Sequence, residues 1–330
     1  MSSVLLCSRK NIQDETVRKV CENFQYLDMD IFVHILSGRK EMKSLAELKK
    51  QAWEIRKANF SNQITFAYPN KTVPISFTGS ECSLNCAHCG GHYLSNMVPL
   101  DKAKAVLKAR GATSCLLSGG CENNGVVPLS KQLDFIHSLK GKYRLNTHLG
   151  LAKSEEIKQI CSLVDLVSFD IVVDQETISE VYHLPYTVED YKHTYTLLQK
   201  EAKSVVPHIC IGLKGGEIKG EYQTLELLKE LGAKKIVFIV FIPTKGTTYE
   251  NRKPPELEEV GRVLATARIE FPDIPIYLGC MRPAGKYRGQ LDLLAVQCGL
   301  NKIVIPTPPA VKYAKEKNLT IIREEECCAL

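Results

Sequence analysis

The chain alternates between two kinds of segment over most of its length. Eight short runs rich in apolar residues indicate strands, at 73–78, 114–118, 143–149, 163–173, 205–213, 235–242, 275–280 and 302–305. Segments with apolar residues at helical spacing lie between them, at 100–109, 129–139, 154–163, 188–202, 221–231, 256–271 and 290–299. Alternation at this pace predicts a parallel sheet with helices packed on it. Eight such units predict an α/β fold, a closed (β/α)8 barrel of the TIM type.

The first part of the chain departs from this alternation. Apolar residues recur at helical spacing from residue 14 to about residue 60, and Ser44 with Glu47 forms a capping-box pattern. We therefore expect two parts. Residues 1–70 form N-terminal helices that pack on the barrel, and residues 71–330 form the barrel with a cysteine-bearing C-terminal tail.

Composition narrows the class of protein. Apolar residues make up 44% and charged residues 24%, as in ordinary globular proteins, and no apolar run is long enough to cross a bilayer. The N-terminus lacks the pattern of a secretory signal, so we expect a cytoplasmic protein. A net charge of +6 without a dense basic stretch does not indicate nucleic-acid binding. The 13 cysteines, an odd number in a reducing compartment, favour metal ligation for those that cluster.

One cysteine cluster directly follows the first predicted strand of the barrel. Cys82, Cys86 and Cys89 have the spacing C-x3-C-x2-C, and a loop of this kind can place three thiolates on an iron–sulfur cluster. With only three ligands in the loop, one iron of a cubane stays open to a small molecule. The alternatives are free thiols or a zinc site, for which His88 or His92 could supply the fourth ligand.

Further candidate residues lie where predicted strands end, which is where barrel enzymes place their working groups. The Gly119–Gly120 pair can admit close approach of a ligand, although an ordinary turn would also explain it. Asp170 and Asp174 can accept hydrogen bonds from a ligand or cap a helix. The loops at 212–221 and 243–247 are rich in glycine or contain proline, and they suit a ligand-binding edge.

These motifs resemble the radical S-adenosylmethionine (SAM) superfamily, in which the open iron binds the amino and carboxylate groups of SAM. The resemblance extends to the biotin synthase group through the segments 55–60, 243–247 and 281–288. It implies reductive cleavage of SAM at a [4Fe–4S] cluster. A low-potential electron donor would supply the electron. The resulting 5′-deoxyadenosyl radical then abstracts hydrogen from an unactivated aliphatic carbon.

The resemblance also implies roles for individual residues. Cys82, Cys86 and Cys89 would ligate the first cluster. The residues expected to contact SAM are His88, Gly90, Gly119, Gly120, Asp170, Gly212, Lys214 and Pro243. Asp174, Arg282 and Arg288 are expected to contact the substrate.

Enzymes of the biotin synthase group often take sulfur from a second cluster, but their ligands for it do not match here. Met281 lies near the place of the arginine that ligates that cluster. Leu117 lies near the place of one of its cysteine ligands. We expect Cys121, Cys280, Cys327 and Cys328 to hold an auxiliary cluster instead, with the tail folded across the barrel mouth.

This pattern is closer to archaeal-type two-component lipoyl synthases. That resemblance implies sulfur insertion into an octanoyl chain on an acyl carrier or lipoyl-domain protein, with a second radical SAM subunit as a possible partner. One alternative keeps the radical without the sulfur: rearrangement, dehydrogenation or carbon–carbon bond formation on a small metabolite. A non-enzymatic alternative is a metal-binding redox module.

Overall fold

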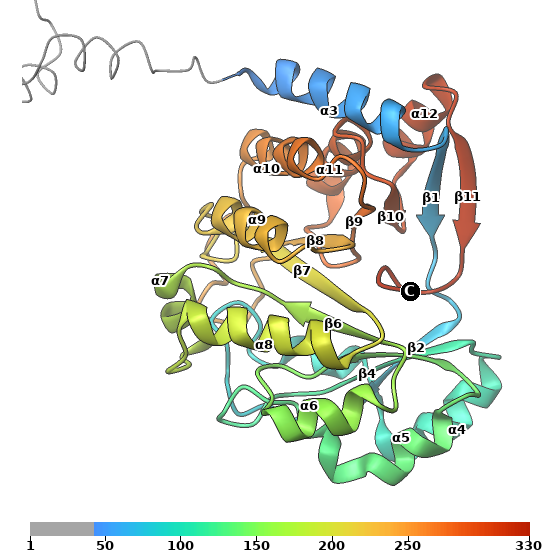
Figure 1. Cartoon of the computed structure of the whole chain (residues 1–330), viewed down its shortest axis with the longest axis vertical. Coiled ribbons are helices and arrows are strands. Elements are labelled where there is room, and N and C mark those ends of the chain that lie inside the picture. The colour runs from blue at the N-terminus through green and yellow to red at the C-terminus, as the bar shows by residue number, and fades with distance from the viewer. Residues whose placement is uncertain (1–42) are drawn as a thin grey trace, which may run out of the picture. The chain divides into compact units, whose positions relative to one another are not determined.

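The computed structural model describes residues 43–330 (Figure 1). The part of the expected N-terminal helical layer that precedes residue 43 lies outside the described residues. Within them, the helix expected after Ser44 is confirmed as α3 (Leu45–Asn59). It packs against α10 (Leu257–Glu270) and contacts α11 (Gly285–Gln297). None of the described helices is long and apolar enough to span a membrane.

All eight predicted strands are present, and each pairs in parallel with the next along the chain. Positions that face the helices carry large apolar side chains such as Ile75, Leu117 and Phe238, each fully buried. The strands are β2 (Thr72–Ser76), β4 (Ser114–Ser118), β5 (Arg144–His148), β6 (Leu166–Asp170), β7 (Val205–Ile211), β8 (Ile236–Val240), β9 (Ile276–Leu278) and β10 (Lys302–Val304).

Three further strands lie at the edges of this curled sheet. β3 (Val98–Pro99) pairs with β2 at one edge. β1 (Gln63–Ala67) pairs with β10 at the other, and β11 (Thr320–Glu324) pairs with β1. Among the described residues no ladder joins β11 to β3, so hydrogen bonds do not close the barrel as we expected. β1 also falls inside the range expected to be helical, because residues 1–70 include the sheet residues Ile64 and Phe66.

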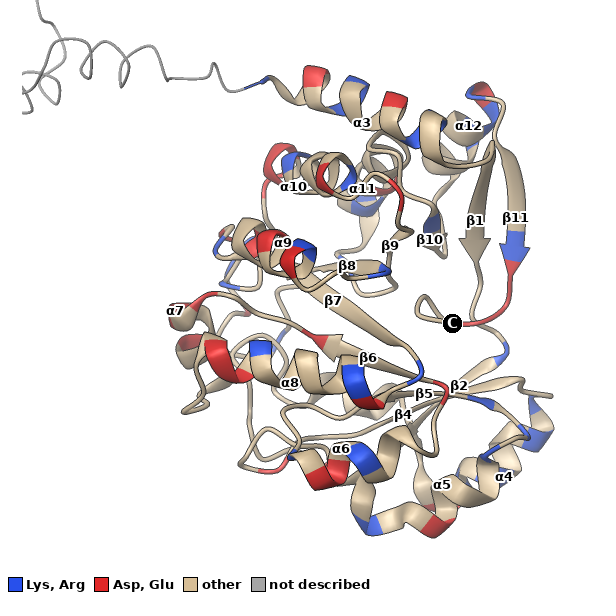
Figure 2. Cartoon of the chain, in the orientation of Figure 1, with Lys and Arg blue, Asp and Glu red and all other residues tan. Residues whose placement is uncertain are grey.

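Helices cover the outer face of the sheet (Figure 1). Acidic and basic residues are interspersed along them, whereas the strands carry few charges (Figure 2). The remaining α-helices are α4 (Leu100–Ala109), α5 (Leu133–Leu139), α6 (Ser154–Cys161), α7 (Gln175–Thr177), α8 (Val188–Glu201), α9 (Glu221–Glu230) and α12 (Pro308–Glu316). Short helical turns are η1 (His92–Asn96), η2 (Leu129–Gln132) and η3 (Ile178–Tyr182).

The C-terminal tail (residues 325–330) corrects another expectation. It follows the short β1–β2 connection, where the Lys71 N–H donates to the Glu325 carbonyl at 2.9 Å. This path takes the tail to the amino ends of the strands rather than across the mouth at their carboxyl ends. Glu326 accepts from Thr113 at 2.7 Å and pairs with Arg144, at the starts of β4 and β5. Ala329 and Leu330 then pack on the first residues of the central strands, Leu166, Val206 and Val237.

A buried ion pair fixes the opposite side of the barrel. Arg282 donates from Nε to Asp292 at 2.7 Å, and neither side chain is exposed. Its remaining donors bind the carbonyls of Gly279 and Val304. Every group of this guanidinium therefore has a partner within the protein. This geometry corrects the expected substrate role of Arg282, which instead ties α11 to the ends of β9 and β10.

We expect Arg282→Met to lower the free energy of unfolding by about 3–5 kcal/mol, because it leaves the buried Asp292 carboxylate without its cation. Chemical denaturation would measure the loss. The double variant Arg282→Met, Asp292→Leu should recover part of the stability, since no charge then stays unpaired. A loss below about 1 kcal/mol for the single variant, the range of exposed ion pairs, would contradict this role.

Candidate active site

The three-cysteine loop leaves β2 at Ser76 and is fastened to neighbouring strand-end loops. Its backbone N–H groups at Ser83 and Ala87 donate to the carbonyls of Cys121 and Val181, each at 2.8 Å. Within the loop, the Cys89 N–H donates to the Cys86 carbonyl at 3.0 Å, so the last two cysteines lie on one turn. These bonds hold the loop above the carboxyl ends of the strands.

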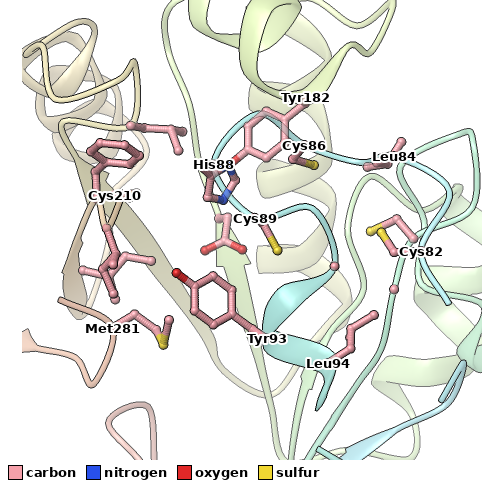
Figure 3. Close-up of a pocket in the computed structure, with 18 of the residues that line it drawn as sticks. Cys82, Leu84, Cys86, His88, Cys89, Tyr93, Leu94, Tyr182, Cys210 and Met281 are labelled. Atoms are coloured by element: carbon pink, nitrogen blue, oxygen red, sulfur yellow. The ribbon is translucent and has the colours of Figure 1, made fainter. Parts of the chain in front are cut away.

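The three thiol groups line a cavity of about 240 Å³. Figure 3 shows Cys82, Cys86 and Cys89 on one side of it, across from Cys210 and Met281. Further lining residues come from the carboxyl ends of several strands: Gly119, Gly120, Cys121, Asp170, Val240, Phe241 and Ile242. The predicted cysteine loop, glycine pair and Asp170 therefore meet at one cavity. Pro243 follows the last of these lining residues, at the end of β8.

The spacing of the thiols distinguishes a cluster from a single ion. Among the described residues no three His, Cys, Asp or Glu side chains are gathered closely enough to hold one metal ion, and this includes the motif cysteines. Each thiolate of a cubane binds a different iron, so its ligands lie farther apart than the four ligands of a zinc ion. Burial, followed by the charges of the neighbouring cysteines, raises the pKa of the Cys86 thiol. A cation is therefore needed to release its proton. Three thiols without a fourth ligand in the loop suit an iron–sulfur cluster with one open iron.

The glycine pair is required by packing of the cysteine loop. A Cβ built on Gly120 would lie 1.9 Å from the Glu81 carbonyl oxygen and 2.6 Å from the Cys82 Cβ. The Gly120 N–H donates to the Thr78 hydroxyl at 2.7 Å, which ties the two loops together. We expected glycine at these positions because a bound ligand would leave no room for a side chain. The structure gives a second reason, because the backbone of the cluster loop itself occupies that space.

His88 offers an unpartnered polar atom at the cavity. Its ring packs edge-on against Tyr182, with ring centroids 5.8 Å apart, and its buried Nδ1 atom has no hydrogen-bond partner. Burial lowers the pKa of His88 to about 4, so the imidazole is neutral at pH 7. A neutral ring with a free nitrogen at a cavity wall is suited to a hydrogen bond with a ligand.

Asp170 lies at the boundary with a second, adjoining cavity of about 180 Å³. Its carboxylate is 3.6 Å from Nδ1 of His148. Burial alone raises the pKa of Asp170, but the hydrogen bond and charge of His148 outweigh it and hold the pKa below its usual value. The second cavity is otherwise largely apolar, lined among others by Leu84, Val127, Leu151, Phe169, Leu184 and Tyr191.

Several other predicted site residues make contacts within the protein. Asp174 caps α7 by accepting from the Thr177 N–H at 2.8 Å, so the helix-cap alternative holds for this residue. The Lys214 ammonium pairs with Glu176 and Glu180. Gly212 has a φ of 73°, and Pro255 lies 2.8 Å from where its Cβ would be.

Two more predicted residues lie outside both cavities, Gly90 at an exposed position and Arg288 at a half-buried one. Gly90 has a φ of 52° at the end of the cysteine loop. Arg288 donates to the Ile305 carbonyl at 3.1 Å. Neither Gly90 nor Arg288 lines either cavity.

The expected four-cysteine auxiliary site is divided in the structure. Cys121 lines both cavities beside the first three cysteines. Cys327 and Cys328 pack against residues at the starts of β6, β7 and β8. Burial, followed by the charge of Cys327, raises the pKa of Cys280. The hydrogen bond from Cys327 and burial, followed by charges that include Cys280, raise the pKa of Cys328. Cys280 has solvent access, yet surrounding protein raises its pKa, as expected for a thiol that faces an internal space. Cys121 therefore belongs with the first site, and the other three form a separate group.

Sequence reasoning missed other residues that line these cavities or the interior between them. They are Tyr93, His148, Tyr182, His208 and Cys210. A polar residue inside an apolar strand was the available signal, as at His208 and Cys210 in β7. Strand alternation determines which of these side chains faces inward, and that requires the exact register.

Comparisons with known proteins agree with this geometry. Biotin synthase of Gloeobacter violaceus is 24% identical over 261 residues, which cover 72% of this chain and 80% of that protein. Methylornithine synthase has the same fold, with a TM-score of 0.59 and 15% identity over 93% of this chain and 97% of that one. The chain is therefore similar in sequence to a biotin synthase and in fold to a methylornithine synthase.

The hydrogenase maturase HydG from Carboxydothermus hydrogenoformans shares the fold, with a TM-score of 0.62 and 16% identity over 95% of this chain and 84% of that one. No protein-family model matches the chain.

Proposed function

We propose that this chain is a radical SAM enzyme that inserts sulfur at an unactivated aliphatic carbon of an octanoyl chain carried on an acyl carrier or lipoyl-domain protein. The observation that carries the proposal is the pair of thiols, Cys327 and Cys328, packed against the first residues of the central strands. Thiols in this position can hold an iron–sulfur cluster, which in the proposed reaction donates the sulfur. The biotin synthase relative supports the same reaction class.

In this proposal Cys82, Cys86 and Cys89 hold the first cluster, and SAM fills the cavity of about 240 Å³. Cleavage of SAM there, with an electron from a low-potential donor, supplies the radical that abstracts hydrogen. The glycine pair and the loops at Gly212 and Pro243 position SAM. The free nitrogen of His88 offers it a hydrogen bond, and Asp170 lies between SAM and the second cavity.

The second cavity suits the substrate. Its apolar lining can bury an aliphatic chain, at about 25 cal/mol per Å² of apolar surface removed from water. It shares Cys86, Cys121, Asp170 and Tyr182 with the SAM cavity, so a chain bound there lies beside the site of radical formation. Asp174, Arg282 and Arg288 are not assigned to the substrate, since Asp174 and Arg282 have structural partners and Arg288 lines neither cavity.

The experiment is an anaerobic incubation of the reconstituted chain with SAM, a low-potential reductant and an octanoylated lipoyl-domain protein. We expect 5′-deoxyadenosine in solution and a mass gain of one or more sulfur atoms on the carrier. The assay is repeated with a second radical SAM subunit of the lipoyl synthase type, which the two-component resemblance suggests as a partner. Deoxyadenosine without any sulfur on the carrier under both conditions would contradict sulfur insertion.

Replacement of Cys327 and Cys328 by Ala should lower bound iron by about one cluster per chain. The reason is that both thiols are ligands of the second cluster, with Cys280 and without Cys121. The sulfur product should disappear while deoxyadenosine formation continues. A matched control replaces Cys161 and Cys298, two buried thiols on the helices. Iron content that falls equally in both double variants, or in neither, would argue against the second cluster.

A further inference from the structure

His208 is a buried polar side chain in the barrel interior. It lies in β7, is 5% exposed, and neighbours the apolar residues that the tail covers. Its Nδ1 atom is 3.1 Å from the Val206 carbonyl oxygen. A carbonyl only accepts, so Nδ1 carries the proton and Nε2 keeps a lone pair.

The Nε2 lone pair faces the tail thiols. Cys328 Sγ lies 3.9 Å from Nε2, a long distance for a hydrogen bond from a thiol. Cys327 is next in the chain, and the Asn146 amide donates to its sulfur at 3.8 Å. Two thiols and an aromatic nitrogen therefore converge at one place.

The tail is held firmly enough to keep these thiols in place. The Cys327 N–H donates to the Thr72 hydroxyl at 2.9 Å. The ammonium groups of Lys235 and Lys302 donate to the carbonyls of Ala329 and Leu330, at 3.1 and 3.2 Å. Lys302 is buried, and burying an ammonium group is costly unless it is paired, so these contacts are a built anchor rather than a frayed end.

We infer that His208 is a nitrogen ligand of the second iron–sulfur cluster, beside Cys327 and Cys328 and opposite Cys280. This inference rests on the proposed function. A histidine that ligates a metal usually donates its other ring N–H to a carbonyl, and His208 does this with Val206. Thiolates and imidazole nitrogens are both ligands of iron–sulfur clusters, with histidine replacing cysteine on one iron of Rieske centres.

The inference predicts a spectroscopic signature. Nitrogen ligation raises the reduction potential of an iron–sulfur cluster relative to ligation by thiolates alone. The test uses the full chain with Cys82, Cys86 and Cys89 replaced by Ala, so that only the second cluster is measured. Pulsed EPR of the reduced cluster should show coupling to a histidine nitrogen, identified by isotopic labelling of histidine. His208→Cys should remove the coupling, retain iron, and make the reduction potential more negative.

His148→Gln is the matched control, because its ring lies 5.5 Å from that of His208 and no contact to a tail thiol is found for it. The coupling should persist in this variant. Three results would each overturn the inference and leave only a thiol–imidazole contact. They are no nitrogen coupling before His208 is replaced, unchanged coupling in His208→Cys, and loss of coupling in His148→Gln. The test protein is the chain with Cys82, Cys86 and Cys89 replaced by Ala. If it binds no iron, or if further removal of Cys327 and Cys328 leaves its iron unchanged, the second cluster itself is refuted.

Discussion

Replacement of Cys82, Cys86 and Cys89 by Ala should abolish SAM cleavage, with deoxyadenosine formation falling to the level of a protein-free control. The expected loss is complete because these three thiols are the proposed ligands of the first cluster. Among the described residues, the other thiols that line the SAM cavity are Cys121 and Cys210, which lie outside this loop. Folding should be largely preserved, because all three side chains lie in a loop and none is fully buried. Anaerobic assays of iron, sulfide and deoxyadenosine, with a thermal melt, would measure both effects.

A control variant removes three thiols outside the loop: Cys115, Cys161 and Cys298, which are buried. That variant should lose stability through cavity formation but keep SAM cleavage and the first cluster. Deoxyadenosine formation at the parental rate in the loop variant would refute the assignment of this loop. Retained iron alone would not, since the second cluster stays in place.

Gly120→Ala should lower cluster occupancy and SAM cleavage on the order of a hundredfold, a loss typical of displacing a site by about 1 Å. A Cβ at this position would lie 1.9 Å from the Glu81 carbonyl oxygen, so the cysteine loop must move away from β4. The cost to stability should be that of ordinary overpacking, about 1–3 kcal/mol. Iron content, SAM binding and the melting temperature would be measured on the same preparation.

Gly289→Ala is the control, because its Cβ would meet only Pro309, at 3.9 Å, in the helix α11. We expect parental activity and unchanged or slightly higher stability from this variant. If Gly120→Ala binds SAM and iron as the parent does, the loop tolerates the displacement. The close contact would then have no functional importance.

Much of the fold was predictable because its signals are local. The eight strands and the helices between them follow from short-range periodicity. The edges of the sheet were not predictable in the same way. β1 and β11 pair with each other across more than two hundred residues, and nothing in their short sequences specifies that partner. The tail's position follows from this pairing, so the error at β1 also misplaced Cys327 and Cys328.

The candidate site was predictable to the extent that spacing alone determines it. The three cysteines share one loop, so C-x3-C-x2-C was sufficient to identify them. A polar residue at a strand end is harder to interpret, because it can cap a helix, pair with a charge or line a cavity. Asp174 caps α7, Arg282 pairs with Asp292, and Asp170 lines both cavities. Tertiary contacts decide among these outcomes, and they are not encoded in any short pattern.

The reaction can be tested by following hydrogen. The reconstituted enzyme is incubated with SAM, a reductant and a lipoyl-domain protein that carries a perdeuterated octanoyl chain, and 5′-deoxyadenosine is analysed by mass spectrometry. Our proposal predicts deuterium in the 5′-deoxyadenosine, with none in the variant that lacks Cys82, Cys86 and Cys89. Deoxyadenosine without deuterium would contradict hydrogen abstraction from the octanoyl chain. Absence of deoxyadenosine from the cluster-loaded enzyme would contradict radical SAM chemistry itself.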